Sequence, residues 1–279
     1  MKVTAIIPSL ANEVTKPYLR LCVESLRASG VDWDIIVVTN GAKAPEPLNI
    51  PGITKRLHTR DQGQANAVNI GVSTVDPNTD YIFVSNDDMY YAPGWDKNLR
   101  FGYPVFSPNL VEPDNNNGSA DPFIKTDGGF ILDEFNRDFV DEGIEHLVSK
   151  SKSKAVLPKE EPGFNLPFFM EKGLWEFLGG YDTAYDPWGS NSDTDLQTRV
   201  NLAGVIPMRL RDVLVYHFSN KSGTFDGTHQ DFYQNNIDYF KSKFGFDRDE
   251  LGSDVWYNKD MLPKDESKIK YEQKKYGKD

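Results

Sequence analysis

The sequence has a single cysteine and no long hydrophobic run. Cys22 is the only thiol among 279 residues, so an internal disulfide is excluded, and so are zinc sites built from several cysteines. No apolar stretch approaches the roughly 20 residues that a membrane helix requires, and residues 1–7 lead into a predicted strand rather than a signal peptide. We therefore expect no transmembrane segment and a cytoplasmic location.

Positive charge is also scarce. The chain has 31 Lys and Arg against 42 Asp and Glu, a formal net charge of −11, which repels polyphosphate backbones, so we expect no bulk nucleic-acid binding. A phosphorylated small molecule can still bind where helix N-termini, a metal ion or a few placed cations neutralise its phosphates. Hydrophobic residues at 38% and aromatic residues at 13% are typical of a folded globular protein.

Short apolar runs alternate with helical patterns over about the first 90 residues. The sequence predicts strands at 3–7, 35–38, 53–58 and 81–84, and helices at 17–30 and 64–75. Such alternation predicts an α/β fold with a mostly parallel central sheet and helices on both faces, a three-layer sandwich. In such folds ligands bind beyond the carboxyl ends of the strands.

The remainder of the chain is less regular at first. We interpret residues 101–165 as excursions rather than a second domain. Residues 166–218 predict a helix, a Gly-Gly turn, a second helix and a strand, and residues 230–244 predict a last helix before a Lys-rich tail.

Three polar residues directly follow the strand predicted at 81–84. Asn86, Asp87 and Asp88 would lie at the carboxyl end of the sheet, where carboxylates repel one another and any phosphate unless a divalent cation joins them. Mg²⁺ and Mn²⁺ are held in this way, by one or two carboxylates and phosphate oxygens. The alternative is a polar turn that closes the strand, because Asn and Asp are turn formers.

A second acidic pair, Asp193 and Asp195, opens a predicted helix with Ser192 as its expected N-cap. A carboxylate here can take a proton from an attacking hydroxyl when geometry brings the two within reach. The alternative is that both aspartates only stabilise the start of the helix. The Gly- and aromatic-rich residues 179–189 before it either stack on a sugar or pack as an ordinary loop.

His217 ends the apolar stretch 213–216. A neutral imidazole at a strand end is a good ligand for a divalent metal, and a structural histidine satisfied by its neighbours is the alternative. Lys221 follows in a hydroxyl-rich loop that either meets a diphosphate or faces solvent.

The order of these motifs resembles that of the family 2 glycosyltransferases, which have the GT-A fold. The resemblance extends from Thr4 to about Gly245. It is carried by the opening strand at Ile6-Ile7-Pro8, by residues 37–41 and 61–71, by Asn86-Asp87-Asp88 at the place of the D-x-D motif, by Leu178-Gly179-Gly180-Tyr181-Asp182, by Ser192-Asp193-Thr194-Asp195-Leu196 with Arg199, by His217, and by residues 239–245.

The resemblance implies a metal-dependent, inverting transfer of a sugar from a nucleotide diphosphate sugar, with a UDP-sugar favoured, to a hydroxyl of a glycan or another acceptor. It implies Asp193 as the general base, and Asp88 and His217 as ligands of Mn²⁺ or Mg²⁺. The residues implied for the nucleotide are Pro8, Ser9, Glu13, Asn40, Gly63, Asn86 and Asp87, and those for the acceptor are Gly180, Trp188 and Asp195.

The same resemblance implies the domain organisation. Residues 1–228 would form the GT-A domain, with a nucleotide-sugar half at about 1–100 and an acceptor and catalytic half at about 101–228. Residues 229–279 would form a C-terminal helical extension with a charged tail.

Two other functions remain as alternatives. A catalytically weak or inactive sugar- or nucleotide-binding protein of the same fold is one, because Asn86 and Ser192 stand where the family has acidic residues. A sugar-phosphate nucleotidyltransferase is the other. That class would need a glycine-rich basic loop after the first strand, and residues 9–13 contain neither glycine nor a cation.

Overall fold

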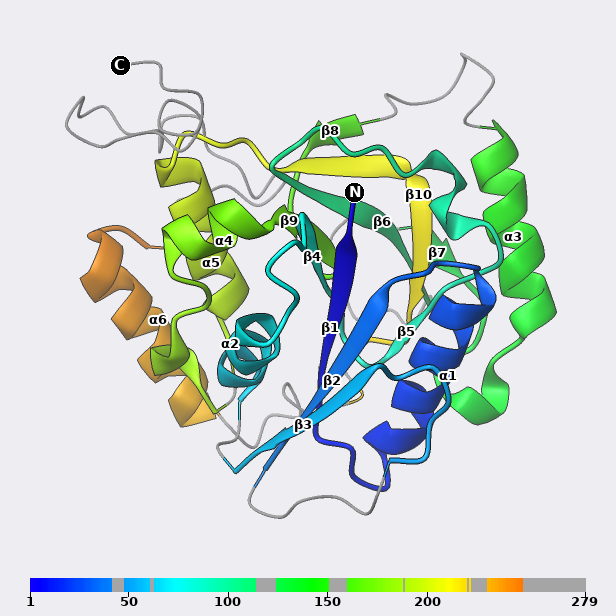
Figure 1. Ribbon diagram of the computed structural model, residues 1–279, viewed down its shortest axis with the longest axis horizontal. Coiled ribbons are helices and arrows are strands. Elements are labelled where there is room, and N and C mark those ends of the chain that lie inside the picture. Colours follow the sequence, from blue (N-terminus) through cyan, green and yellow to red (C-terminus); the bar gives the residue numbers. More distant parts are fainter. Residues whose placement is uncertain are drawn as a thin grey trace.

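A computed structural model describes residues 1–41, 48–60, 63–113, 124–150, 160–187, 189–219, 221 and 230–247. Figure 1 shows a central sheet flanked by helices on both sides. The strands are β1 (Val3–Ser9), β2 (Asp34–Asn40), β3 (Lys55–Thr59), β4 (Tyr81–Val84), β5 (Met89–Tyr90), β6 (Val105–Pro113), β7 (Ile124–Thr126), β8 (Glu160–Pro162), β9 (Phe168–Glu171) and β10 (Met208–His217). The α-helices are α1 (Thr15–Ala28), α2 (Gln64–Ser73), α3 (Arg137–Lys150), α4 (Lys172–Leu178), α5 (Ser192–Leu202) and α6 (Gln230–Phe244).

The sheet is mixed, and its first half is wholly parallel. The strand order is β3-β2-β1-β4-β9-β6-β10-β5, and β1, β2, β3 and β4 pair in parallel. Strand β9 lies antiparallel between β4 and β6, while β10 runs parallel to β6 and antiparallel to β5 and β8. The predicted α/β class is confirmed, and the antiparallel pairs are an addition to it.

The interpretation of residues 101–165 as excursions was wrong. This segment contributes β6, β7, α3 and β8, and β6 is buried along its whole length. Strand β6 was not predicted because its polar residues interrupt the apolar run that marks a buried strand. Ser107 is buried, and its hydroxyl forms a hydrogen bond of 3.2 Å with the Asn165 side chain. This hydrogen bond offsets the cost of removing the hydroxyl from water.

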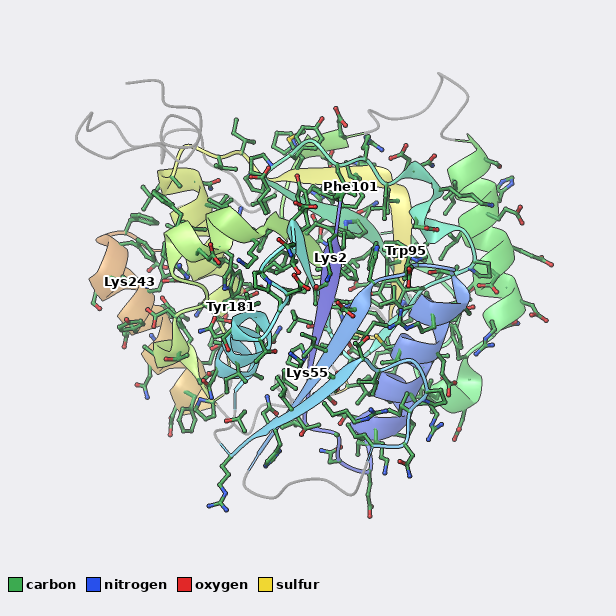
Figure 2. The ribbon with its side chains drawn as sticks, in the orientation of Figure 1. Lys2, Lys55, Trp95, Phe101, Tyr181 and Lys243 are labelled. Atoms are coloured by element: carbon green, nitrogen blue, oxygen red, sulfur yellow. The ribbon has the colours of Figure 1, made fainter. Side chains whose placement is uncertain are left out.

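Alternating residues of the parallel strands face two separate cores. Ala5 and Ile7 of β1 pack with helix α1 on one face of the sheet, whereas Ile6 between them packs with α2, α4 and α5 on the other. Trp95 and Tyr181 mark these two sides in Figure 2. The alternation follows from the two-residue repeat of a strand, and it confirms the expected layer of helices on each face.

Helix α3 covers the far end of the sheet. Its Val140 and Ile144 pack with Tyr216 of β10 and with Tyr18 of α1 in a third core. None of the helices in the described part of the chain is both long and apolar enough to cross a bilayer.

Candidate active site

The turn after β4 lies against the carboxyl end of β1. The Ser9 hydroxyl donates to Asp87 Oδ2 at 2.5 Å, and both side chains are buried. Burial and the neighbouring Asp88 carboxylate raise the pKa of Asp87 above its usual range. Two of the residues predicted for the nucleotide, Ser9 and Asp87, thus contact each other across adjacent parallel strands.

Asp88 and His217 come together although they are far apart in the sequence. Strand β10 pairs antiparallel with β5, which sets His217 beside Met89, and His217 Nε2 lies 3.3 Å from Asp88 Oδ1. Burial raises the pKa of Asp88, but His217 lowers it further and the net pKa is below the usual range. Burial lowers the pKa of His217, but Asp88 and Glu112 raise it to about 10.

Glu112 of β6 orients the histidine from its other side. Its Oε1 lies 2.8 Å from His217 Nδ1, and the Glu112 side chain is buried. A carboxylate on one ring nitrogen of a metal-binding histidine fixes the ring and leaves the other nitrogen facing the metal. Glu112 was not predicted as a site residue, because it lies in β6, a strand that the sequence did not predict.

The Asp88 and His217 pair fits one divalent cation. Two atoms that share an octahedral ion with bonds of about 2.1 Å lie roughly 3 Å apart, close to the 3.3 Å between Asp88 Oδ1 and His217 Nε2. Within the residues that the structure describes, no group of three or more His, Cys, Asp or Glu side chains could hold a metal. Of the residues described, Asp88 and His217 would be the two ligands, and phosphate oxygens or water would occupy other positions, as is usual for Mg²⁺. The imidazole nitrogen favours Mn²⁺ over Mg²⁺.

The predicted nucleotide residues line the carboxyl ends of β1 and β2. Pro8 is in register with Val38, and Asn40, the last residue of β2, donates from Nδ2 to the Gly63 carbonyl at 2.9 Å. Its Oδ1 is buried and has no hydrogen-bond partner among the residues that the structure describes. Such an acceptor can be satisfied by a donor group of a bound ligand. Glu13 lies exposed in the loop after β1.

Asp193 and Asp195 have different surroundings although both lie in the first turn of α5. Asp193 is partly exposed, and its Oδ1 accepts from the Thr194 amide at 2.8 Å. Ser192 was wrongly predicted as the N-cap: Asn191 holds that position with a φ of 68°, and the Ser192 hydroxyl donates to the Gly189 carbonyl at 2.6 Å.

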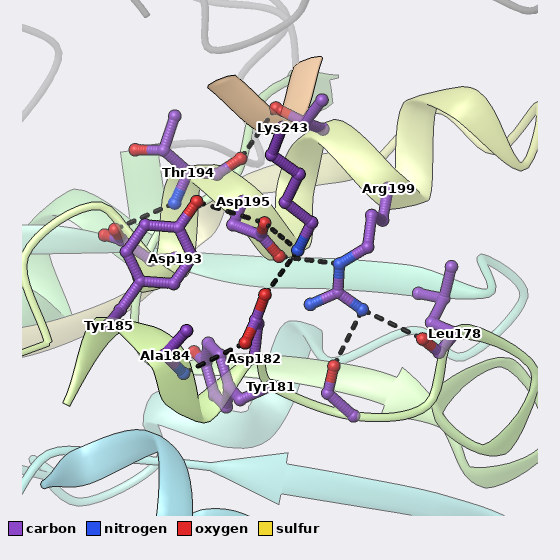
Figure 3. Close-up of polar contacts among 12 residues, drawn as sticks. Leu178, Tyr181, Asp182, Ala184, Tyr185, Asp193, Thr194, Asp195, Arg199 and Lys243 are labelled. Carbon is purple, nitrogen blue, oxygen red and sulfur yellow. Dashed lines mark hydrogen bonds and ion pairs between the residues drawn. The ribbon is translucent and has the colours of Figure 1, made fainter. Parts of the chain in front are cut away.

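Asp195 is fully buried in a network of ion pairs, drawn in Figure 3. Its Oδ1 lies 2.6 Å from Arg199 Nε, and its Oδ2 lies 2.6 Å from Lys243 Nζ. The Tyr185 hydroxyl donates to Oδ2 at 3.2 Å. The structure thus gives Asp195 internal partners where the sequence predicted contact with an acceptor.

The other predicted acceptor residues lie in the loop before α5. Gly180 has a φ of 75°, and a Cβ there would lie 2.6 Å from Asn69 Oδ1, so glycine permits the loop to approach α2. Its carbonyl accepts from Arg199 Nη1 at 2.7 Å. Trp188 lies outside the described residues.

Gln64 of the N-terminal half connects the two acidic regions. Gln64 Nε2 donates to Asn86 Oδ1 at 3.3 Å, and a Cβ on Gly189 would lie 3.9 Å from Gln64 Cβ and 3.7 Å from Ser192 Oγ. Gln64 therefore contacts the turn after β4 and lies beside the start of α5. The two acidic regions lie at one edge of the sheet.

Asp186 also connects the loop before α5 to the start of α2. Its carboxylate accepts from the amides of Ala65 and Asn66 at 3.3 and 2.8 Å, so it stabilises the N-terminal turn of α2. A Cβ on Gly63 would lie 2.0 Å from Asp186 Cγ, which requires glycine at that position. Neither Gln64 nor Asp186 was found from the sequence, because their partners are distant along the chain.

Comparison with known proteins gives one family match. Residues 4–100 match the family model described as Glycosyl transferase family 2. Residues 4–100 therefore form a glycosyl transferase family 2 domain. No curated protein matches its sequence.

Two solved structures are similar to this chain. GalNAc-T7 with UDP, GalNAc and Mn²⁺ is 11% identical, with a TM-score of 0.50 over 94% of this chain and 53% of that one. S. aureus TarS 1-349 is 11% identical, with a TM-score of 0.49 over 90% of this chain and 74% of that one. The chain thus spans about half of the GalNAc-T7 chain, and the likeness shows the fold.

Proposed function

We propose that this glycosyltransferase is metal-dependent and inverting, and that it moves a sugar from a nucleoside diphosphate sugar to an acceptor hydroxyl. The observation that carries the proposal is the shared edge of the sheet. Asp88 and His217 lie 3.3 Å apart there, and Gln64 links their turn to the loop that leads into Asp193.

The nucleotide would bind over the carboxyl ends of β1, β2 and β4. Asn40 Oδ1 is buried at this edge, has no partner within the described part of the chain and would accept a hydrogen bond from the nucleotide. Pro8, Ser9, Glu13 and the loop around Gly63 would line the site. These residues belong to the nucleotide-sugar half that we assign to residues 1–100.

Asp88 and His217 would hold the cation, with Asn86 and Asp87 beside it. A divalent ion bound there would neutralise the charge that develops on the departing diphosphate. Glu112 keeps the His217 ring oriented through Nδ1.

Asp193 would act as the general base. It would take the proton of the acceptor hydroxyl as the acceptor oxygen bonds to the anomeric carbon and the bond from that carbon to the diphosphate oxygen breaks. One displacement of this kind inverts the anomeric configuration. Asp193 is the partly exposed aspartate of the pair, whereas Asp195 is fully buried.

The first donors to test are UDP-sugars with Mn²⁺. GalNAc-T7, which shares the fold, has been solved with UDP and Mn²⁺, and the imidazole of His217 favours Mn²⁺ over Mg²⁺. Calorimetric titration of nucleoside diphosphates with and without Mn²⁺ is the direct test. We expect UDP to bind with Mn²⁺ and at least tenfold more weakly without it. Binding that is equally tight without any divalent ion would contradict the metal dependence.

The two alternative functions predict different products. An inactive binding protein of the same fold would bind the nucleotide and release no sugar from any donor. A nucleotidyltransferase would join a sugar phosphate to a nucleoside triphosphate and release pyrophosphate. Mass spectrometry of reactions with a panel of UDP-sugars, and with sugar phosphates and nucleoside triphosphates, distinguishes all three functions. An anomer-sensitive NMR spectrum of the product then tests inversion.

A further inference from the structure

Helix α6 contacts the loop that precedes Asp193. The side chain of Asn236 is buried, and its Nδ2 donates to the carbonyls of Tyr185 and Ser190 and contacts Ser190 Oγ, each at 3.0 Å. One amide group on α6 therefore holds the two ends of the segment 185–190. Ser190 is three residues before Asp193 in the sequence.

The same helix contacts the chain directly after Asp193. Lys243 Nζ lies 2.6 Å from Asp195 Oδ2 and 2.6 Å from Asp182 Oδ2, as Figure 3 shows. The Tyr239 hydroxyl donates to the same Asp182 oxygen at 2.9 Å. Helix α6 thus holds the polypeptide on both sides of Asp193 without itself supplying a ligand to the metal site.

Lys243 completes the charge balance of this network. The fully buried Asp195 and the adjacent Asp182 carry two negative charges, and Lys243 and Arg199 supply the two positive ones. A buried carboxylate that loses one cation is costly, so the local structure rearranges to let water reach it. Since Asp195 lies in the first turn of α5, such a rearrangement would displace Asp193.

We propose that Lys243 and Asn236 of α6 are positioning residues for the general base, fixing the loop and the first turn of α5 that carry Asp193. The inference rests on the proposed role of Asp193. A displacement of about 1 Å in a reacting group can cost on the order of a hundredfold in rate. Residues 4–100 carry the family match, so a C-terminal helix outside that match would set how fast the site works.

The first test compares Lys243→Met with Lys241→Met. Lys241 is two residues before Lys243 on the same helix, with a side chain that is 60% exposed, and it lies 3.6 Å from Asp247 rather than in the network. The substrate is the UDP-sugar that the wild-type enzyme turns over fastest. We expect Lys243→Met to lower kcat roughly 10- to 100-fold and to leave the KM for the donor within about twofold. Lys241→Met should match wild type, and Lys243→Arg should recover most of the lost rate because it keeps the charge.

A double mutant separates positioning from general loss of stability. If Lys243 acts through Asp193, the double variant Asp193→Asn, Lys243→Met should be no slower than Asp193→Asn alone. A further loss of rate equal to that of Lys243→Met by itself would overturn the inference. Asn236→Ala offers a second variant that keeps all four charges. It should show the same fall in kcat at constant KM, even if Lys243→Met does not fold.

The outcomes distinguish this inference from the function on which it rests. If Asp193→Asn abolishes turnover while Lys243→Met and Asn236→Ala keep the wild-type kcat, the positioning role is wrong and the proposed function stands. If Asp193→Asn keeps its turnover, the proposed base is wrong and the positioning role falls with it.

Discussion

The two acidic clusters at the active edge differ in how their charge is balanced. In the cluster after β4, the buried carboxylates of Asp87, Asp88 and Glu112 have His217 as the cationic side chain in contact. In the cluster at the start of α5, Asp182 and Asp195 are balanced by Lys243 and Arg199. The contacts described thus give three carboxylates and one imidazole in the first cluster, and two carboxylates and two cationic side chains in the Asp182 and Asp195 network.

The difference indicates what each region does. A site that binds a divalent ion needs uncompensated carboxylates, and these destabilise the protein until the ion arrives. A neutral, buried network has no charge left for a ligand, so its contribution is to hold the backbone. The aspartate-rich sequence alone does not separate these roles, because the cations that neutralise Asp195 lie 4 and 48 residues further along the chain.

The largest effect, a fall in kcat, is expected from substitution of Asp193. Asp193→Asn should lower kcat by about 10²- to 10⁴-fold, the usual contribution of a general base. The Kd for UDP with Mn²⁺ should stay within about twofold of wild type, because the nucleotide binds elsewhere on the edge. Steady-state kinetics and calorimetry measure the two quantities. Retained turnover would remove Asp193 from its proposed role.

Substitution of Asp195 should lower the free energy of unfolding much more than substitution of Asp87. Asp195→Asn leaves Arg199 and Lys243 without their shared carboxylate and should lower the free energy of unfolding by roughly 3 kcal/mol. Asp87→Asn relieves repulsion from Asp88 and keeps an acceptor for Ser9, so it should change stability by less than about 1 kcal/mol. Urea unfolding without metal measures both. Equal losses in the two variants would contradict the contrast in charge balance.

Metal-dependent stabilisation should depend on Asp88. A ligand at about 100 times its Kd adds roughly 2.7 kcal/mol, which in a chain of this size raises Tm by roughly 5 °C. We expect this rise with UDP and Mn²⁺ in the wild type, and its loss in Asp88→Asn and His217→Ala. Asp182→Asn is the control for a change of charge elsewhere and should keep the rise. A full shift in Asp88→Asn would place the cation at other residues.

The smallest effect is the pH dependence of the stability that the Asp182 carboxylate contributes. Burial raises the pKa of its carboxyl, but Lys243 and Tyr239 lower it further, so the net pKa lies below the ordinary 3.8. The stability that this carboxylate contributes is therefore present above the unfolded-state pKa and is lost as the pH falls through the folded-state pKa. Asp182→Asn should cost about 1 kcal/mol at pH 7, and the difference from wild type should shrink below about pH 4. A difference that grows on acidification would contradict this direction.

The strands that the sequence predicted most clearly are those with a continuous run of buried apolar residues. Strands β1, β2 and β4 are short apolar runs, so hydrophobic patterning is enough to place them. Strand β6 is equally buried but carries Ser107, Asn109 and Glu112. Its polar groups are satisfied by partners such as Asn165 and His217 that only the folded chain brings close.

The candidate site shows the same division. Asp88, His217 and Asp193 could be predicted as site residues because each follows or ends a predicted strand or begins a predicted helix, and the local sequence pattern identifies such positions. Glu112, Gln64 and Lys243 were missed as site residues because their roles depend on contacts across 105, 22 and 48 residues. Asp195 was predicted to bind acceptor from the family resemblance, and its ion pair with Lys243 depends on a contact across 48 residues.

The distance between the bound cation and position 193 tests the central claim most directly. In an Asp193→Cys variant a nitroxide label can be attached selectively, because Cys22 is buried and its thiol pKa is raised by that burial. We predict that Mn²⁺ with UDP strongly broadens the nitroxide spectrum, and that Asp88→Asn in the same variant removes the broadening. A spectrum unchanged while calorimetry shows Mn²⁺ and UDP bound would mean that the cation and Asp193 do not share one site.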